Sequence, residues 1–169
     1  MIYVCGLRGV VTAAGHVQPR HIISITDPGT PAPVVAGLLP GCHLMLEFHD
    51  IGLPQDGLVA PQQEHIEQIL TFAARWDRQH PLLVHCHAGV SRSMATAVIV
   101  HALNARGREA EVVRLLRSRA PHAHPNRRMI ALADALLACD GRLIAAVETM
   151  GPATSVDQEG PLVHFWLEP

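Results

Sequence analysis

The sequence predicts an α/β fold, with a central, mainly parallel sheet flanked by helices and a C-terminal part that is all helical. Two observations lead to this prediction. Short apolar runs alternate with helical patterns over the first hundred residues, and beyond residue 107 the patterns are helical. The chain has 169 residues, 49% of them hydrophobic and 17% charged. This composition fits one compact domain over residues 1–169 and argues against disorder.

Four strands are expected from short runs rich in β-branched and other apolar residues. They are Ile2–Leu7, His21–Ile25, His43–Phe48 and Leu82–His85. The last run is short and apolar, as a central parallel strand should be. Residues 26–31 are rich in turn-forming residues and predict a loop, and residues 32–39 are expected to form a short helix. The tail after Gly151 is expected to be either an extra strand or a docked segment.

Helices are expected between and after these strands. One opens at Pro61, where the missing N–H costs nothing, and apolar residues recur at helical spacing as far as Trp76. Residues 93–100 are alanine-rich and apolar almost all round, which predicts a central helix packed on the sheet. Three more helices are expected over residues 109–119, after Asn126 as N-cap, and over residues 142–149.

The most informative run is HCHAGVSRS, residues 85–93, between the fourth strand and the central helix. A short loop between a strand and a helix N-terminus directs backbone N–H groups at an anion and favours a thiolate at Cys86. Gly89 permits a backbone conformation that a Cβ atom would obstruct. Arg92 offers a planar fork of donors that matches two phosphate oxygens. The run therefore predicts an anion-binding cradle with a built-in nucleophile.

Two neighbours of the thiol have expected supporting roles. Ser93 is placed to give its hydroxyl hydrogen to the sulfur and to stabilise that sulfur as a leaving group. His85 is expected to orient the loop through side-chain hydrogen bonds, not to act as a base, because Cys86 is already ionised.

The run resembles the signature of cysteine-dependent protein tyrosine phosphatases, and its ending, AGVSRS, most resembles the dual-specificity branch. The resemblance covers roughly residues 40–137. It implies that Cys86 attacks the phosphorus of a phosphate monoester and forms a cysteinyl-phosphate, while Arg92 and the loop amides hold the equatorial oxygens. The implied phosphate-binding residues are His87, Ala88, Gly89, Val90, Ser91 and Arg92.

The resemblance also implies an aspartate that protonates the leaving oxygen and then activates water. Asp50 closely follows the strand 43–48, which is similar to the family's strand-then-aspartate arrangement. We expect Asp50 to be this general acid. Asp56 is the alternative, because it lies six residues further on and nearer the helix. Asp56-Gly57 is also a turn dipeptide, which would be its ordinary role.

The implied function is hydrolysis of phosphotyrosine, with activity on phosphoserine and phosphothreonine left open. The expected partners are phosphorylated proteins or peptides, with phosphate-like anions (phosphate, sulfate, vanadate) in the loop. A silent phosphoprotein-binding module is one alternative. A phosphoinositide phosphatase is another, ranked lower because the variable loop residues include no lysine or arginine, and RNA 5′-triphosphate ranks lower still. Phe48 and His49 are the only candidates for an aromatic clamp.

Composition narrows the remaining choices. The net charge of −2 gives no indication of nucleic-acid binding. The chain contains no apolar run of about 18 residues, so no membrane-spanning helix is expected. The N-terminus reads as a first strand and not as a signal peptide. The four cysteines show no paired spacing, which favours the cytoplasm. Cys5, Cys42 and Cys139 are expected to be structural thiols, with a redox role toward Cys86 left open.

No cofactor or metal is expected. The closest histidine pairs are His85 with His87, which the loop explains, and His122 with His124, which lie in a proline-rich turn where exposed histidines are common. Four arginines follow the signature, and they are interpreted as a solvated helix face in preference to an attraction for acidic substrates. They are Arg117, Arg119, Arg127 and Arg128.

Overall fold

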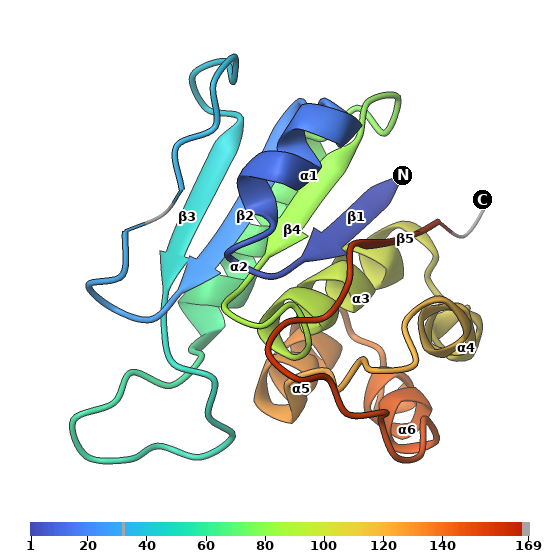
Figure 1. Cartoon of the computed structure of the whole chain (residues 1–169). Helices are drawn as coiled ribbons and strands as arrows, with labels where there is room; N and C mark the ends of the chain where they lie inside the picture. Colours follow the sequence, from blue (N-terminus) through green and yellow to red (C-terminus); the bar gives the residue numbers. More distant parts are fainter. Residues whose placement is uncertain (32, 167–169) are drawn as a thin grey trace.

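A five-stranded sheet with the strand order β3-β2-β4-β1-β5 forms the centre of the computed structural model, which describes residues 1–31 and 33–166. Helices cover both of its faces (Figure 1). The strands are β1 (Ile2–Cys5), β2 (His21–Thr26), β3 (His43–Glu47), β4 (Leu82–His85) and β5 (Val163–Phe165). The first four strands run parallel, and β5 pairs antiparallel with β1. The predicted fold class is confirmed, and the tail forms the extra strand.

The register brings three strand ends to one edge of the sheet. Cys5 at the end of β1 pairs with His85 at the end of β4, and Ser24 of β2 pairs with the same histidine. In parallel α/β sheets, ligands bind beyond the carboxyl ends of the strands. The segment that follows His85 therefore starts at the edge where a site is expected.

Side chains alternate between two cores of different size. The larger core lies under α2 (Gln63–Arg75), α3 (Arg92–Asn104) and the C-terminal helices, and eleven of the thirteen α3 residues are buried. The smaller core lies under α1 (Val10–Val17). Helix α1 was not predicted from the sequence, because its buried face consists only of one valine and two alanines. A helix of 8 residues with so small an apolar face has no clear periodic signal.

Helix α2 begins two residues later than predicted from Pro61. Gln62 has an extended backbone and acts as the N-cap, and its N–H donates to Nδ1 of His65 at 3.0 Å. The short helix expected over residues 32–39 is wrong for residues 33–39, and residue 32 lies outside the described residues. Pro31 and Pro33 lack backbone N–H groups, and Gly37 has a φ of +85°, so this segment turns instead of coiling.

Three helices follow α3 as predicted. They are α4 (Glu109–Arg119), α5 (Arg127–Leu136) and α6 (Arg142–Glu148). Oδ1 of Asn126 accepts from the N–H of Met129 at 3.0 Å, which confirms Asn126 as the N-cap of α5. Over the described part of the chain, no helix is both long and apolar enough to cross a membrane.

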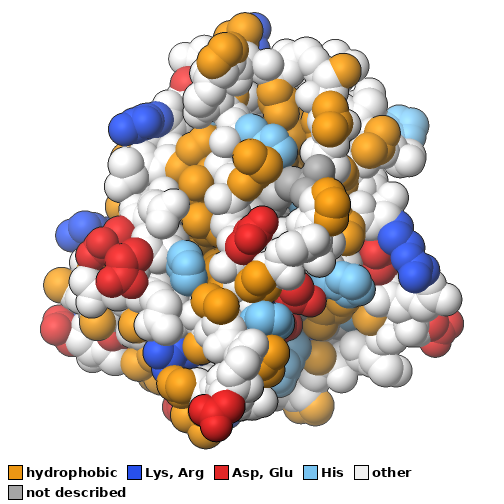
Figure 2. Space-filling view, turned by 90° about the vertical axis from the view of Figure 1, so that its left-hand side faces the viewer, with side chains coloured by type: hydrophobic (Ala, Val, Ile, Leu, Met, Phe, Trp, Pro, Cys, Tyr) orange, Lys and Arg blue, Asp and Glu red, His pale blue; other side chains and the backbone are white. Residues whose placement is uncertain are grey.

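The face that carries the edge strand β3 is mixed in character (Figure 2). Hydrophobic side chains lie among acidic and histidine side chains, and arginines are few and scattered on it. The exposed apolar residues of this chain include Val34, Leu39 and Met45, and single exposed apolar side chains of this kind are ordinary on a protein surface.

Candidate active site

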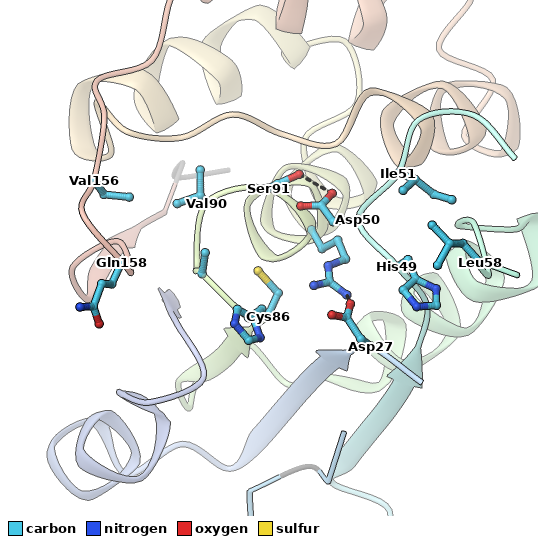
Figure 3. Close-up of a pocket in the computed structure, with 13 residues that line it drawn as sticks. Asp27, His49, Asp50, Ile51, Leu58, Cys86, Val90, Ser91, Val156 and Gln158 are labelled. Carbon is cyan, nitrogen blue, oxygen red and sulfur yellow. Dashed lines mark hydrogen bonds and ion pairs between the residues drawn. The ribbon is translucent and has the colours of Figure 1, made fainter. Parts of the chain in front are cut away.

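The run singled out in the sequence forms a loop, residues 86–92, between β4 and the first turn of α3, here called the phosphate loop. It lies at the bottom of a cavity of about 590 Å³ (Figure 3). Segments from three other parts of the chain complete the lining. The lining residues are Asp27, His49, Asp50, Ile51, Leu58, Cys86, His87, Ala88, Val90, Ser91, Arg92, Val156 and Gln158.

Backbone carbonyls of the phosphate loop point away from the cavity, because neighbouring segments bind them from outside. The N–H groups of Leu7, Gly160 and His124 donate to the carbonyls of His87, Ala88 and Val90 at 2.9, 2.8 and 2.9 Å. In a trans peptide, the next N–H points opposite to the carbonyl. The N–H groups of Ala88, Gly89 and Ser91 are therefore turned toward the side on which an anion would lie.

Gly89 is the position where the loop requires glycine. Its φ is +71°, a conformation that L side chains rarely adopt. A Cβ atom there would lie 2.7 Å from the carbonyl carbon of Cys5 and 2.7 Å from the nitrogen of Gly6. Both contacts are with backbone atoms, which cannot rotate away. The expectation for Gly89 is confirmed, and the close contact with the end of β1 supplies the reason.

Cys86 lies on the cavity floor, with only 2% of its surface exposed. Its Sγ is 3.1 Å from Oγ of the fully buried Ser93, so a hydrogen bond joins the two side chains as the sequence predicted. A second buried thiol, Cys5, is at the end of the neighbouring strand. Burial raises the pKa of Cys5 to about 12, and the charges of Glu159 and Cys86 act in the same direction. Cys5 is therefore held as a neutral thiol.

Arg92 is buried, and one of its terminal nitrogens is already bound. Nη1 donates to Oδ1 of Asp27 at 2.7 Å and to the carbonyl of Phe48 at 2.5 Å. Nε is buried and has no hydrogen-bond partner among the described residues. Buried donors in folded proteins are nearly always paired, so this N–H is a candidate donor to an anion bound on the loop.

Asp50 is held at the rim of the cavity by two donors. Its Oδ1 accepts from Oγ of Ser91 at 2.7 Å and from Nδ2 of Asn126 at 2.7 Å. The loop that starts at Asp50 is closed at its neck, where His49 and Val59 exchange two hydrogen bonds of 2.7 and 2.9 Å. Asp56 is exposed at the far end of that loop and is not among the lining residues.

His85 is fully buried beneath the loop. Its Nε2 lies 2.6 Å from Oγ of Ser24, which in turn lies 2.7 Å from Nε2 of His43. Burial lowers the pKa of His85 to about 4, so its imidazole is neutral at pH 7. The sequence predicted hydrogen bonds to the loop, and a backbone hydrogen bond with Cys86 acts on the pKa of His85. The side-chain partner is Ser24 on β2, so His85 also connects the two strands on which the loop rests.

Other predicted residues lie apart from the cavity. Phe48 is fully buried and stacks on His65 at 4.7 Å, so the suggestion that it clamps a substrate ring is wrong, whereas His49 does line the cavity. The four arginines after the signature do not line it. Arg117 instead donates to the carbonyls of Met150 and Gly151.

The expectation that His122 and His124 are exposed holds only for His124. His122 is 4% exposed and lies against Gly160. Across residues 1–31 and 33–166, no three histidine, cysteine or carboxylate side chains come together in a way that could hold a metal ion.

The sequence did not identify several residues of the site. Asp27, Asn126 as a partner of Asp50, and the pair Val156 and Gln158 are far from the signature in the chain. Asp27 had one available signal, since it directly follows β2 and therefore lies at the same sheet edge as the loop. The other residues reach the cavity only through tertiary packing.

Comparisons with known proteins agree with this geometry. Residues 45–125 match the family model described as protein-tyrosine phosphatase. The crystal structure of DUSP15 is similar, with a TM-score of 0.64 and 17% identity over 88% of this chain and 89% of that one. Human DUSP28 has a TM-score of 0.61 and 19% identity over 81% and 94%.

The structure of PTPMT1 in complex with PI(5)P has a TM-score of 0.63 and 14% identity over 82% and 90% of the two chains. At such identities the likeness to solved structures shows the fold alone. No curated protein sequence matches this chain. The family match covers the signature loop, and the geometry of that loop agrees with it. The chain is therefore similar to the protein tyrosine phosphatases over residues 45–125, and it has the fold of the dual-specificity phosphatases.

Proposed function

We propose that the protein hydrolyses phosphate monoesters, above all phosphotyrosine on proteins, through a cysteinyl-phosphate on Cys86. The observation that carries this proposal is the arrangement of groups around one cavity. Cys86, Arg92 and the inward-facing loop amides border the cavity in which a tetrahedral anion would bind. A buried nucleophile beside unmet donors is the arrangement that transfer of a phosphoryl group requires.

Binding comes first in the proposed mechanism. The phosphate oxygens accept hydrogen bonds from the loop amides and from Nε of Arg92, while Nη1 stays on Asp27 and holds the guanidinium in place. The positive end of the α3 dipole points at the same position. These donors are fixed before the substrate arrives, so charge that develops on the equatorial oxygens is stabilised without reorganisation.

Phosphoryl transfer follows. Sγ of Cys86 attacks phosphorus, the S–P bond forms, and the bond from phosphorus to the ester oxygen breaks. Asp50 gives its proton to that leaving oxygen. Both donors to Asp50 use Oδ1, so we assign the transferred proton to Oδ2.

Hydrolysis of the intermediate reverses these roles. The Asp50 carboxylate takes a proton from water, the water oxygen attacks phosphorus, and the S–P bond breaks. Sulfur leaves as the thiolate, and the Ser93 hydroxyl, 3.1 Å from Sγ, stabilises it by donating a hydrogen bond. Inorganic phosphate leaves, and the cycle needs no metal or redox cofactor in this scheme.

The proposed setting is the cytoplasm, because a thiolate nucleophile needs reducing conditions and all four cysteines are free. The proposed partners are phosphorylated proteins or peptides. Phosphate, sulfate and vanadate are expected to compete for the same loop.

The test is hydrolysis of p-nitrophenyl phosphate in the presence of a chelator, by wild type and by Cys86→Ser. We expect turnover that survives the chelator, is blocked by vanadate and is lost in the variant. Well-folded, reduced wild type without turnover would refute the enzyme and favour a module that only binds phosphoproteins. Binding of phosphopeptide by that inactive protein would then identify the module.

A further inference from the structure

One wall of the cavity comes from a part of the chain far beyond the residues that match the family model. The segment Thr154–Gly160, here called the C-terminal wall, lies between α6 and β5. Val156 and Gln158 of this segment line the cavity beside the phosphate loop (Figure 3). The shape of the cavity above Cys86 therefore depends on this segment as well as on the signature.

The C-terminal wall is fixed to the phosphate loop and to the turn after β1. Two residues of the wall bind Arg8. The backbone N–H of Arg8 donates to Oε1 of Glu159 at 3.0 Å, and its guanidinium donates to Oε1 of Gln158. Gly160 donates to the carbonyl of Ala88 at 2.8 Å. A Cβ atom on Gly160 would lie 2.4 Å from Nε2 of the buried His122 and 3.3 Å from the carbonyl oxygen of Gly89, so the wall packs closely against both His122 and the loop.

The opposite wall of the cavity comes from the loop that His49 and Val59 close, and its apolar lining residues Ile51 and Leu58 lie at the two ends of that loop. In Figure 3, Val156 lies on one side of Cys86, and Ile51 and Leu58 lie well apart from it on the other. An apolar group that extends from the sulfur toward the C-terminal wall would therefore contact Val156.

The charges of the cavity set a second condition. Arg92 is the one arginine among the lining residues, and Asp27 and Asp50 supply two carboxylates. The lining residues include no lysine and no second arginine. One phosphate on the loop is compensated by Arg92 and the amides, whereas a further phosphate would find no such cation. This distribution disfavours polyphosphorylated ligands such as multiply phosphorylated inositides.

We propose that the C-terminal wall, through Val156, is a specificity determinant that selects aromatic phosphate esters. This inference rests on the proposed function, since it concerns the substrate of the same site. The ring of phosphotyrosine packs against Val156 while its phosphate lies on the loop. The side chains of phosphoserine and phosphothreonine are too short to reach Val156, so they gain nothing from it.

The experiment compares phosphotyrosine and phosphothreonine versions of one peptide. For wild type we expect a higher kcat/KM on phosphotyrosine. The substitution Val156→Asp is expected to lower the ratio of the two kcat/KM values by about tenfold, mainly through KM for phosphotyrosine. The matched control is Val34→Asp, at a valine that is 89% exposed and does not line the cavity, and it should leave the ratio unchanged. An unchanged ratio in Val156→Asp would overturn the inference.

A binding measurement separates this inference from the proposed function. In the Cys86→Ser background, calorimetry should show tighter binding of the phosphotyrosine peptide than of the phosphothreonine peptide. Adding Val156→Asp should remove that preference. A wild type that binds with this preference but does not turn over would refute only the enzyme. A preference that survives Val156→Asp would refute the role of the wall, whether or not the protein is active.

Discussion

The phosphate loop and the C-terminal wall border the same cavity but are built in opposite ways. In the loop, Cys86, Gly89 and Arg92 are buried, and neighbouring segments bind the carbonyls from outside. In the wall, Val156 is half-buried and Gln158 is exposed. The residues of the proposed chemistry are therefore held in place by burial and by hydrogen bonds to the loop backbone. The proposed selectivity depends instead on a surface segment, in which substitutions cost little stability.

The largest expected effect tests the loop side of this comparison. Cys86→Ser is expected to lower kcat on an aryl phosphate by more than about 10³-fold, because the hydroxyl is a far weaker nucleophile than the thiolate. The matched control is Cys42→Ser, at a half-buried cysteine outside the cavity lining. Equal losses in both variants would mean that the assay reports folding and not chemistry.

A smaller effect is expected at the rim of the cavity, where Asp50 binds Ser91 of the phosphate loop. Asp50→Asn should lower kcat by about 10²-fold or more on a phosphate ester with a poor leaving group, because proton donation is then needed most. The loss should shrink on a good leaving group such as p-nitrophenol. Asp56→Asn is the control, since Asp56 is exposed and outside the cavity lining. Full activity of Asp50→Asn on the poor leaving group would transfer the role to another acid.

Glycine substitutions compare a tightly packed loop with an open one. Gly89→Ala is expected to destabilise the protein by about 1–3 kcal/mol, because the positive φ is strained and the Cβ atom meets the backbone of Cys5 and Gly6. A Cβ atom added at Gly52 would meet no heavy atom within 4 Å, and the φ of Gly52 is not positive. Gly52→Ala should therefore hardly change the free energy of unfolding. Urea unfolding of both variants measures the difference. Similar midpoints would show that the phosphate loop can relax around a side chain.

The pH dependence of stability tests the strand ends beneath the loop. Burial lowers the pKa of His85 from its ordinary value of 6.5 to about 4. Between these values the unfolded chain binds a proton that the folded chain does not. Stability is therefore full above pH 6.5 and falls as the pH drops toward 4, by up to about 1.4 kcal/mol per pH unit for this residue.

The variant His85→Gln removes this titration while keeping a polar group near Ser24. Burial also lowers the pKa of His101 to about 4, so the variant should make the acid-induced loss of stability smaller without abolishing it. Denaturant unfolding at several pH values between 4 and 7 measures the slope. An identical slope in the variant and in wild type would show that His85 is protonated at little cost in the fold.

The sequence predicted the reactive residues better than it predicted the shape of the cavity. The signature gave Cys86, Gly89 and Arg92, because local spacing alone determines a strand, a tight loop and a helix N-terminus. Asn126 was found as a helix cap, but its bond to Asp50 joins residues 76 positions apart and has no local signal. The C-terminal wall was missed for the same reason. The helix expected over 32–39 failed because prolines and a glycine outweighed the apolar content.

The most direct test of the account is the location of phosphate in the reaction intermediate. A single-turnover reaction with an aryl phosphate is quenched, and the protein is digested and analysed by mass spectrometry. The account predicts one added phosphate on the peptide that contains Cys86, with no such peptide from Cys86→Ser. Turnover with phosphate on a different side chain, or with no phosphoenzyme even when hydrolysis is slowed by Asp50→Asn, would contradict it.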